Sequence, residues 1–75
     1  MRVDISYISD GSYIVDTVID NKLEEIATVY KLNKAINIAK DYIEDAGATK
    51  GDVIMIFTGV ILEWSGNKWN RIVAV

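Results

Sequence analysis

Residues 23–46 constrain the fold most, because their apolar side chains cannot all lie on one face of a single straight helix. Two apolar sets each follow helical spacing: Leu23, Ile26, Ala27 and Tyr30, and then Leu32, Ala35, Ile36, Ala39, Tyr42, Ile43 and Ala46. A helix turns by about 100° per residue, so the second set begins about half a turn away from the first. The first part is also rich in β-branched and aromatic residues, which favour strands. We therefore predict a strand over residues 23–30 and a helix over about residues 33–46, with Asn33 as the N-cap and Gly47 as a left-handed stop.

The residues before this segment have the patterns of two strands. Residues 3–7 alternate between apolar and polar side chains, which is typical of a strand with one buried face. Residues 13–19 are β-branched almost throughout. Residues 10–12 and 20–22 contain Gly, Asp and Asn, which tolerate positive φ and indicate turns.

The residues after the helix predict a long hairpin. Residues 53–57 are an unbroken apolar run, as expected of a strand buried on both faces. We interpret the following Thr58–Gly59 as a bulge or bend, after which the strand resumes over residues 60–64. Residues 69–75 complete the hairpin as its second strand.

Together these patterns predict a single α+β domain over residues 1–75, with a mainly antiparallel sheet in the order βββαββ packed against one helix. The chain is 51% hydrophobic, which is rich for a small domain, and it has no cysteine to form a disulfide. A core of this size contributes only about 3–5 kcal/mol to stability. We therefore expect the protein to bury further apolar surface against a second copy, as a homodimer.

The charge of the chain argues against several classes of partner. A net charge of −3 and scattered basic residues are unfavourable for nucleic acid, so we expect no direct nucleic-acid binding. No apolar run approaches the roughly 20 residues of a membrane-spanning helix, and residues 1–4 do not begin a signal peptide, so we expect a cytoplasmic protein without membrane contact.

Trp64 and Trp69 flank a four-residue tip, residues 65–68, and would lie directly opposite one another in a hairpin. One interpretation is that the two indoles fix the hairpin register and cover one end of the core. The other is that they anchor a partner, since Trp is enriched at interface hot spots. The partner-binding candidates are Trp64, Asn67, Lys68, Trp69 and Arg71.

Nothing in the sequence predicts catalysis. The chain lacks histidine and cysteine, and a metal site would need oxygen ligands alone. Asp41, Glu44 and Asp45 share one helix face, which is more typical of a solvated surface than of an ion site. We therefore predict no catalytic residues, no metal site, no cofactor and no enzymatic activity.

Two hypotheses for the function remain. The first is a small non-enzymatic protein-interaction or assembly module, homodimeric through its sheet or its carboxy-terminal hairpin. The second is a small acidic inhibitor, a nucleic-acid-mimicking decoy of phage or mobile-element type that binds a host nucleic-acid-processing protein. Its surface would comprise Asp4, Asp16, Asp20, Glu24 and Glu25, because the first 30 residues carry six acidic against two basic side chains.

Overall fold

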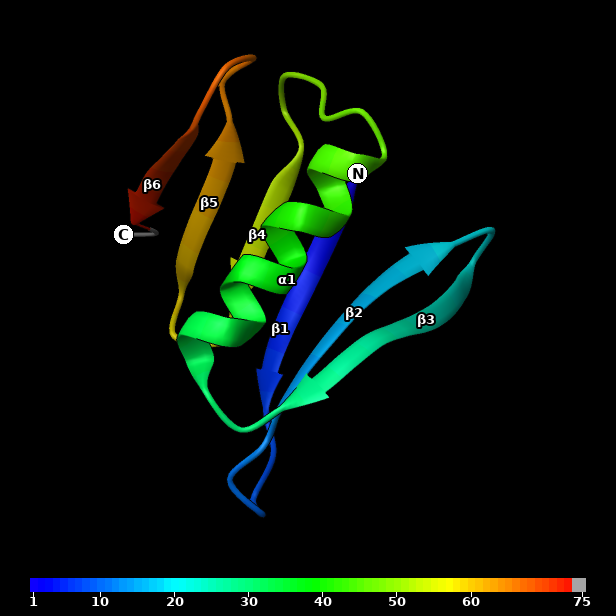
Figure 1. Ribbon diagram of the computed structural model, residues 1–75, viewed down its shortest axis with the longest axis vertical. Coiled ribbons are helices and arrows are strands. Elements are labelled where there is room, and N and C mark those ends of the chain that lie inside the picture. The colour runs from blue at the N-terminus through cyan, green and yellow to red at the C-terminus, as the bar shows by residue number, and fades with distance from the viewer. Residues whose placement is uncertain (74–75) are drawn as a thin grey trace.

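The computed structural model describes residues 1–73, which form one mixed sheet and one helix (Figure 1). The elements are β1 (Arg2–Tyr7), β2 (Tyr13–Ile19), β3 (Lys22–Val29), α1 (Leu32–Asp45), β4 (Val53–Ile56), β5 (Val60–Trp64) and β6 (Trp69–Val73). The strand order in the sheet is β3-β2-β1-β4-β5-β6. β1 and β4 are parallel, and the other neighbouring pairs are antiparallel. The predicted α+β class, with a mainly antiparallel sheet on one helix, is confirmed.

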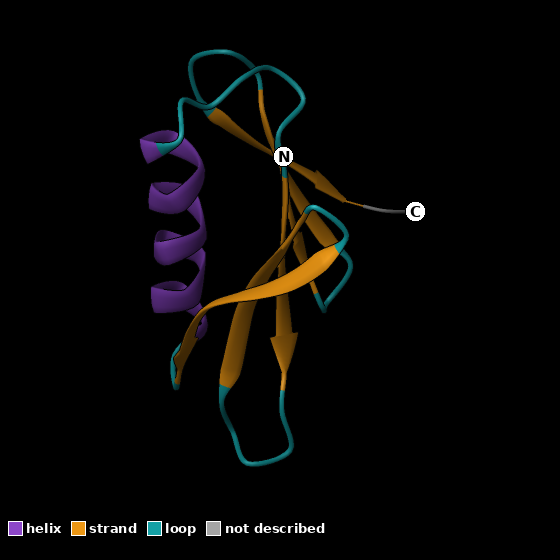
Figure 2. Cartoon of the chain, turned by 90° about the vertical axis from the view of Figure 1, so that its right-hand side faces the viewer, coloured by secondary structure: helices purple, strands orange, loops and turns teal. Residues whose placement is uncertain are grey.

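Helix α1 covers one face of the sheet, because it connects the edge strand β3 to β4 and must cross β2 and β1 on the way. It packs on β1, β2, β3 and β4. Figure 2 shows the helix standing on one side of the sheet, with no helix on the other side. We call these sides the helix face and the open face.

The core lies between α1 and the strands that it crosses. Val3, Ile5, Val15 and Ile54 are fully buried on the helix face of the sheet. The helix contributes Ala35, Ala39 and Ile43, also fully buried, at spacings of four residues that place them on one stripe. The small alanines let the helix approach the sheet closely, while Ile43 fills the space further along.

The predicted break between strand and helix near Lys31 is confirmed. β3 ends at Val29 and α1 begins at Leu32. The prediction of Asn33 as the N-cap is wrong, because Lys31 occupies that position with extended backbone and no side-chain capping hydrogen bond. The prediction for Gly47 is confirmed: its φ is +85°, and its N–H donates to the carbonyl oxygen of Glu44 at 3.0 Å.

The prediction of a bulge or bend inside one strand at Thr58–Gly59 is wrong, since the chain reverses there. Gly59 has a φ of +93°, and its N–H donates to the carbonyl oxygen of Ile56 at 2.9 Å, which makes a tight turn between antiparallel β4 and β5. Residues 53–64 therefore contribute two strands to the sheet. The last predicted strand, 69–75, is β6 as far as Val73, and residues 74–75 lie outside the described residues.

The prediction that residues 53–57 are buried on both faces is also wrong. Ile54 and Ile56 are buried on the helix face, whereas Val53 and Met55 are half-buried on the open face. Phe57 follows the strand and is 49% exposed. An unbroken apolar run does not require two covered faces, and here residues 1–73 place no layer over the second face.

The two predicted turns of the amino-terminal half are confirmed. Gly11 has a φ of +92° in the turn between β1 and β2. Asp20 and Asn21, with φ of +52° and +64°, connect β2 to β3, and positive φ at both central residues is what a two-residue turn of type I′ requires.

A bulge in β3 at Ile26 shifts the register with β2.

We expect the Ile43→Ala variant to lose about 2–5 kcal/mol of unfolding free energy, because the side chain is fully buried and its loss leaves a cavity between helix and sheet. Ile19→Ala, at a side chain that is 44% exposed, is the matched control and should cost much less. Urea unfolding followed by circular dichroism measures both. Equal losses would contradict the position assigned to the core.

Candidate protein-interaction surface

The two tryptophans form a cross-strand pair at the end of the β5–β6 hairpin. Trp64 and Trp69 are register partners, and their ring centroids lie 5.2 Å apart with an edge-to-face angle of 63°. The N–H of Ser65 donates to the carbonyl oxygen of Lys68 at 2.9 Å and closes the tip. The prediction that the indoles lie directly opposite one another is confirmed.

The indole of Trp69 packs against the core, and both indoles are half-buried. The Trp69 Nε1–H points to Glu44 Oε2 on α1 at 3.4 Å, a long contact. The backbone also holds this end of the hairpin, since the N–H of Trp64 donates to the carbonyl oxygen of Asp52 at 2.8 Å. These contacts support the first interpretation, in which the pair fixes the register and covers one end of the core.

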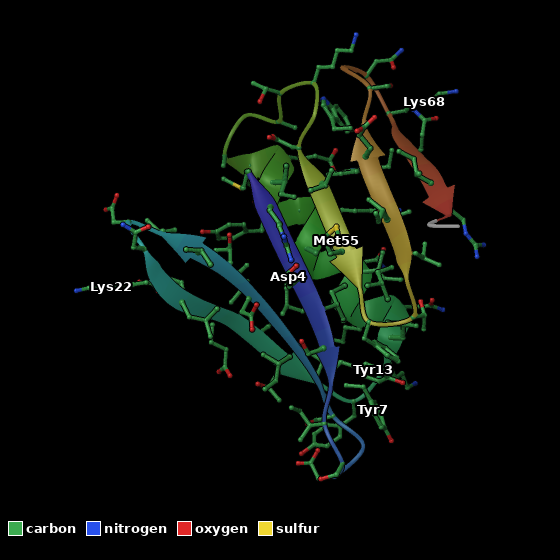
Figure 3. The ribbon with its side chains drawn as sticks, turned by 180° about the vertical axis from the view of Figure 1, so that it is seen from behind. Asp4, Tyr7, Tyr13, Lys22, Met55 and Lys68 are labelled. Atoms are coloured by element: carbon green, nitrogen blue, oxygen red, sulfur yellow. The ribbon has the colours of Figure 1, made fainter. Side chains whose placement is uncertain are left out.

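The other three candidates lie around this pair. Asn67 and Lys68 are exposed in the tip, where Asn67 Oδ1 accepts a hydrogen bond from Ser65 Oγ at 2.9 Å. Figure 3 shows Lys68 at the end of the hairpin, far from Lys22 on the β2–β3 hairpin. Arg71 is exposed and lies opposite Leu62, on the same face of the hairpin as the tryptophans. The structure therefore brings Trp64, Trp69 and Arg71 together on one face.

β5 has an unusual environment for an interior strand. It is hydrogen-bonded to β4 on one side and to β6 on the other, and four of its five residues are apolar. Yet all five are only half-buried, whereas β4 alternates between half-buried and buried residues. Neither face of β5 is fully covered by the described part of the chain.

On the helix face, an apolar groove of about 310 Å³ runs between α1 and the β5–β6 hairpin. Leu32 and Ile36 form its wall on the helix, and Val60 and Leu62 form its floor. Arg71, on the edge strand β6, is the charged residue among those that line the groove. The groove exists because one helix of about 10–12 Å diameter cannot span a sheet whose six strands are about 4.8 Å apart.

On the open face, one row of side chains crosses the whole sheet. The successive registers place in this row Glu25, Asp16, Asp4, Met55, Ile61 and Ile72. Half of the row is acidic, on β3, β2 and β1, and half is apolar, on β4, β5 and β6. Figure 3 shows Asp4 and Met55, the two residues at the boundary, side by side on this face.

The acidic half of the row repels itself. The carboxylates of Asp4 and Glu25 flank Asp16 on both sides, and the pKa of Asp16 is raised, first by burial and then by these two charges. Arg2 Nε contacts Asp4 Oδ1 at 2.9 Å and compensates part of the charge. A shallow depression of about 440 Å³ lies over this region and is lined by Arg2, Asp4 and Asp16 among others.

The predicted acidic surface is thus only partly assembled. Asp4, Asp16 and Glu25 lie in one row, but Glu24 pairs with Thr17 on the opposite face, and Asp20 lies in the turn. Within residues 1–73, no three acidic side chains are grouped so that they could hold a metal ion.

The sequence did not reveal the apolar half of the open face. The pattern of residues 53–57 predicts a doubly buried Met55, and no local signal distinguishes Ile61 and Ile72 from the isoleucines of the core. One weak signal points to this half of the face. Residues 60–64 have apolar side chains at both odd and even positions, hence on both faces of the strand, and one helix can cover only one of these faces.

No protein-family model, curated protein or solved structure matches this chain. Among the described residues, no helix has the length and apolar content that crossing a membrane requires.

We expect Asp16→Asn to raise the unfolding free energy by a few tenths to about 1 kcal/mol at neutral pH, because the amide removes the central charge of the row. The folded-state pKa of Asp16 is raised above its ordinary 3.8, so its ionised form destabilises the fold at higher pH, and this penalty disappears as the pH falls through the raised pKa. The gap between variant and wild type should therefore be absent below about pH 3.8 and open as the pH rises. Urea unfolding at a series of pH values measures it.

Asp41→Asn is the matched control, since it changes the net charge equally at an exposed helix position. An equal gain in both variants would show that net charge, and not the carboxylate row, is responsible.

Proposed function

We propose that this protein is a non-enzymatic protein-interaction module that forms a homodimer through its β5–β6 hairpin and the adjoining part of the open face. The single observation that supports this proposal is the state of β5, an interior strand that has apolar side chains on both faces and is fully covered on neither. Sheets of this kind are normally covered on at least one face over their whole width.

The apolar part of the open face supplies a contact area of suitable character. Met55 and Ile61 are half-buried, and Ile72 is 41% exposed. The molecule measures 35 × 30 Å across its broad side, which leaves room for the roughly 800 Å² per partner of a standard interface. Apolar side chains, Met among them, are typical of the core of an interface.

The acidic half of the open face limits where a second copy can lie. Burying the carboxylates of Asp4, Asp16 and Glu25 without partners would cost several kcal/mol. If two copies stacked these rows face to face, each carboxylate would lie against either a carboxylate or an apolar side chain of the other copy. Contact over β4, β5 and β6 leaves these three carboxylates in water and includes one carboxylate of the open face, that of Glu63 on β5.

We expect wild-type protein to sediment as a concentration-dependent dimer, and Ile72→Lys to weaken the dimer at least about tenfold by placing a charge in the contact. Val18→Lys is the matched control, since Val18 is 60% exposed on the same open face but on β2. Sedimentation equilibrium measures both, with folding checked by circular dichroism. A strict monomer at high micromolar concentration would refute the homodimer, and equal weakening by both variants would refute its location.

The second candidate function is the acidic decoy. It is supported by the alignment of Asp4, Asp16 and Glu25 in one row across three adjacent strands. The folded protein holds these carboxylates close enough for Asp4 and Glu25 to raise the pKa of Asp16. The Lys and Arg side chains of a nucleic-acid channel would neutralise these carboxylates, as they neutralise the phosphates of a nucleic acid.

The decoy predicts that the protein inhibits at least one member of a panel of purified DNA- and RNA-processing enzymes at low salt. Inhibition should decline as salt is raised, and a variant combining Asp4→Asn, Asp16→Asn and Glu25→Gln should lose it. Inhibition that is unchanged at high salt, or retained by the neutralised variant, would exclude this mechanism.

A further inference from the structure

The two edges of the sheet differ in how well they are protected against pairing with another chain. The β3 edge carries Lys22, Glu24 and Glu25 and a bulge at Ile26, and charges and bulges are the devices by which natural sheets block edge pairing. The β6 edge pairs with β5 in continuous register without a bulge, and Arg71 is its charged residue. Of the two edges, β6 is therefore the one left open to pairing.

The hairpin tip determines which backbone groups of β6 point outward. Ser65 donates to the carbonyl oxygen of Lys68, so 65 and 68 form a hydrogen-bonded pair. Pairs alternate along an antiparallel ladder, which makes Trp69 and Arg71 non-hydrogen-bonded positions with respect to β5. Their N–H and C=O groups consequently face away from β5 and are free for another strand.

A second copy of β6 can pair with this edge around a twofold axis in different registers. Centring the axis on Arg71, the middle of the strand, gives the greatest overlap but places Arg71 directly opposite the partner's Arg71. Like charges in this position are destabilising. Centring the axis on Asn70 places Trp69 opposite the partner's Arg71, twice by symmetry, and a guanidinium next to an indole is favourable.

We propose that the protein dimerises by antiparallel pairing of β6 with β6 of a second copy, centred on Asn70, so that Trp69 of each copy contacts the partner's Arg71. This inference rests on the homodimer proposed above and adds to it the edge and the register. Arg71 then has two effects: it disfavours the register in which it meets itself, and it favours the one in which it meets an aromatic ring. The half-buried indole of Trp69 thereby serves both the core of its own chain and the contact with the partner.

This pairing joins the two sheets into one through β6. In the Asn70 register Ile72 lies opposite the partner's Lys68, so the apolar half-rows of the two copies, Met55, Ile61 and Ile72, share the open face of the joined sheet but are offset along the strands. On the helix face, the groove of each copy gains the neighbouring hairpin as a further wall.

Disulfide trapping tests the register, because the chain has no cysteine of its own. The three single variants are Asn70→Cys, Arg71→Cys and Ile72→Cys. In the proposed register the Cα atoms of the two copies of residue 70 lie about 4.5–5.5 Å apart, within the range for a disulfide. The two copies of residue 71 are diagonal neighbours at about 7–8 Å, which is beyond that range.

Oxidation of the three variants is followed on non-reducing gels for the folded proteins and, as a reactivity control, in denaturant. Wild type is sedimented at the same concentration. We expect Asn70→Cys to form the cross-linked dimer on the order of tenfold faster than Ile72→Cys when folded, and all three variants to react alike in denaturant.

Preferential trapping of Ile72→Cys, or trapping of Asn70→Cys no faster than that of Ile72→Cys, would overturn the Asn70 register. Arg71→Cys removes the charge that selects the register, so its own trapping does not report the register of the wild type. If none is trapped while wild type sediments as a dimer, the edge inference is wrong and the proposed homodimer stands through its open face. If wild type is monomeric and none is trapped, both fail.

Discussion

The path of the single helix across the sheet determines which strands have a covered face and which remain partly exposed. Helix α1 leaves the edge strand β3 and must reach β4, which is paired with β1 in the middle of the sheet. It therefore lies over β1 to β4 and buries Val3, Ile5, Val15 and Ile54 against its own stripe of Ala35, Ala39 and Ile43. β5 and β6 are added beyond it by two successive turns. Val60, Leu62 and Trp69 pack against the edge of the core and are consequently only half-buried.

The distribution of charge follows from the same topology. Strands β3, β2 and β1 carry the acidic half of the transverse row, and β4, β5 and β6 carry the apolar half. The parallel pairing of β1 with β4 is what places Asp4 next to Met55 and makes the boundary sharp (Figure 3). One half of the open face resists burial because of its carboxylates, and the other half exposes apolar area to water. This division is why we place the contact with a second copy on β4, β5 and β6.

The tryptophan pair has a structural role, and the proposed contact with a partner builds on it. The indoles of Trp64 and Trp69 pack edge to face at the end of the hairpin, and Trp69 also packs against the core. In the dimer that we propose, the two interpretations of the tryptophans are compatible, because Trp69 would cover the core of its own chain and contact Arg71 of the second copy.

The sequence alone determined the elements whose signals are local. The phase break near Lys31, the positive-φ residues Asp20, Asn21 and Gly47, and the opposition of the two tryptophans all depend on residues within a few positions of one another. It did not determine that Thr58–Gly59 is a turn, because glycine is compatible with a bulge or a reversal and the choice depends on what the following strand pairs with. Nor did it determine which strands are neighbours, and hence that three carboxylates from separate strands align or that β5 is left half-covered. Those features were decided by the tertiary structure, because pairing between distant strands is set by the crossover of the helix and by register across the sheet, which no local pattern of residues records.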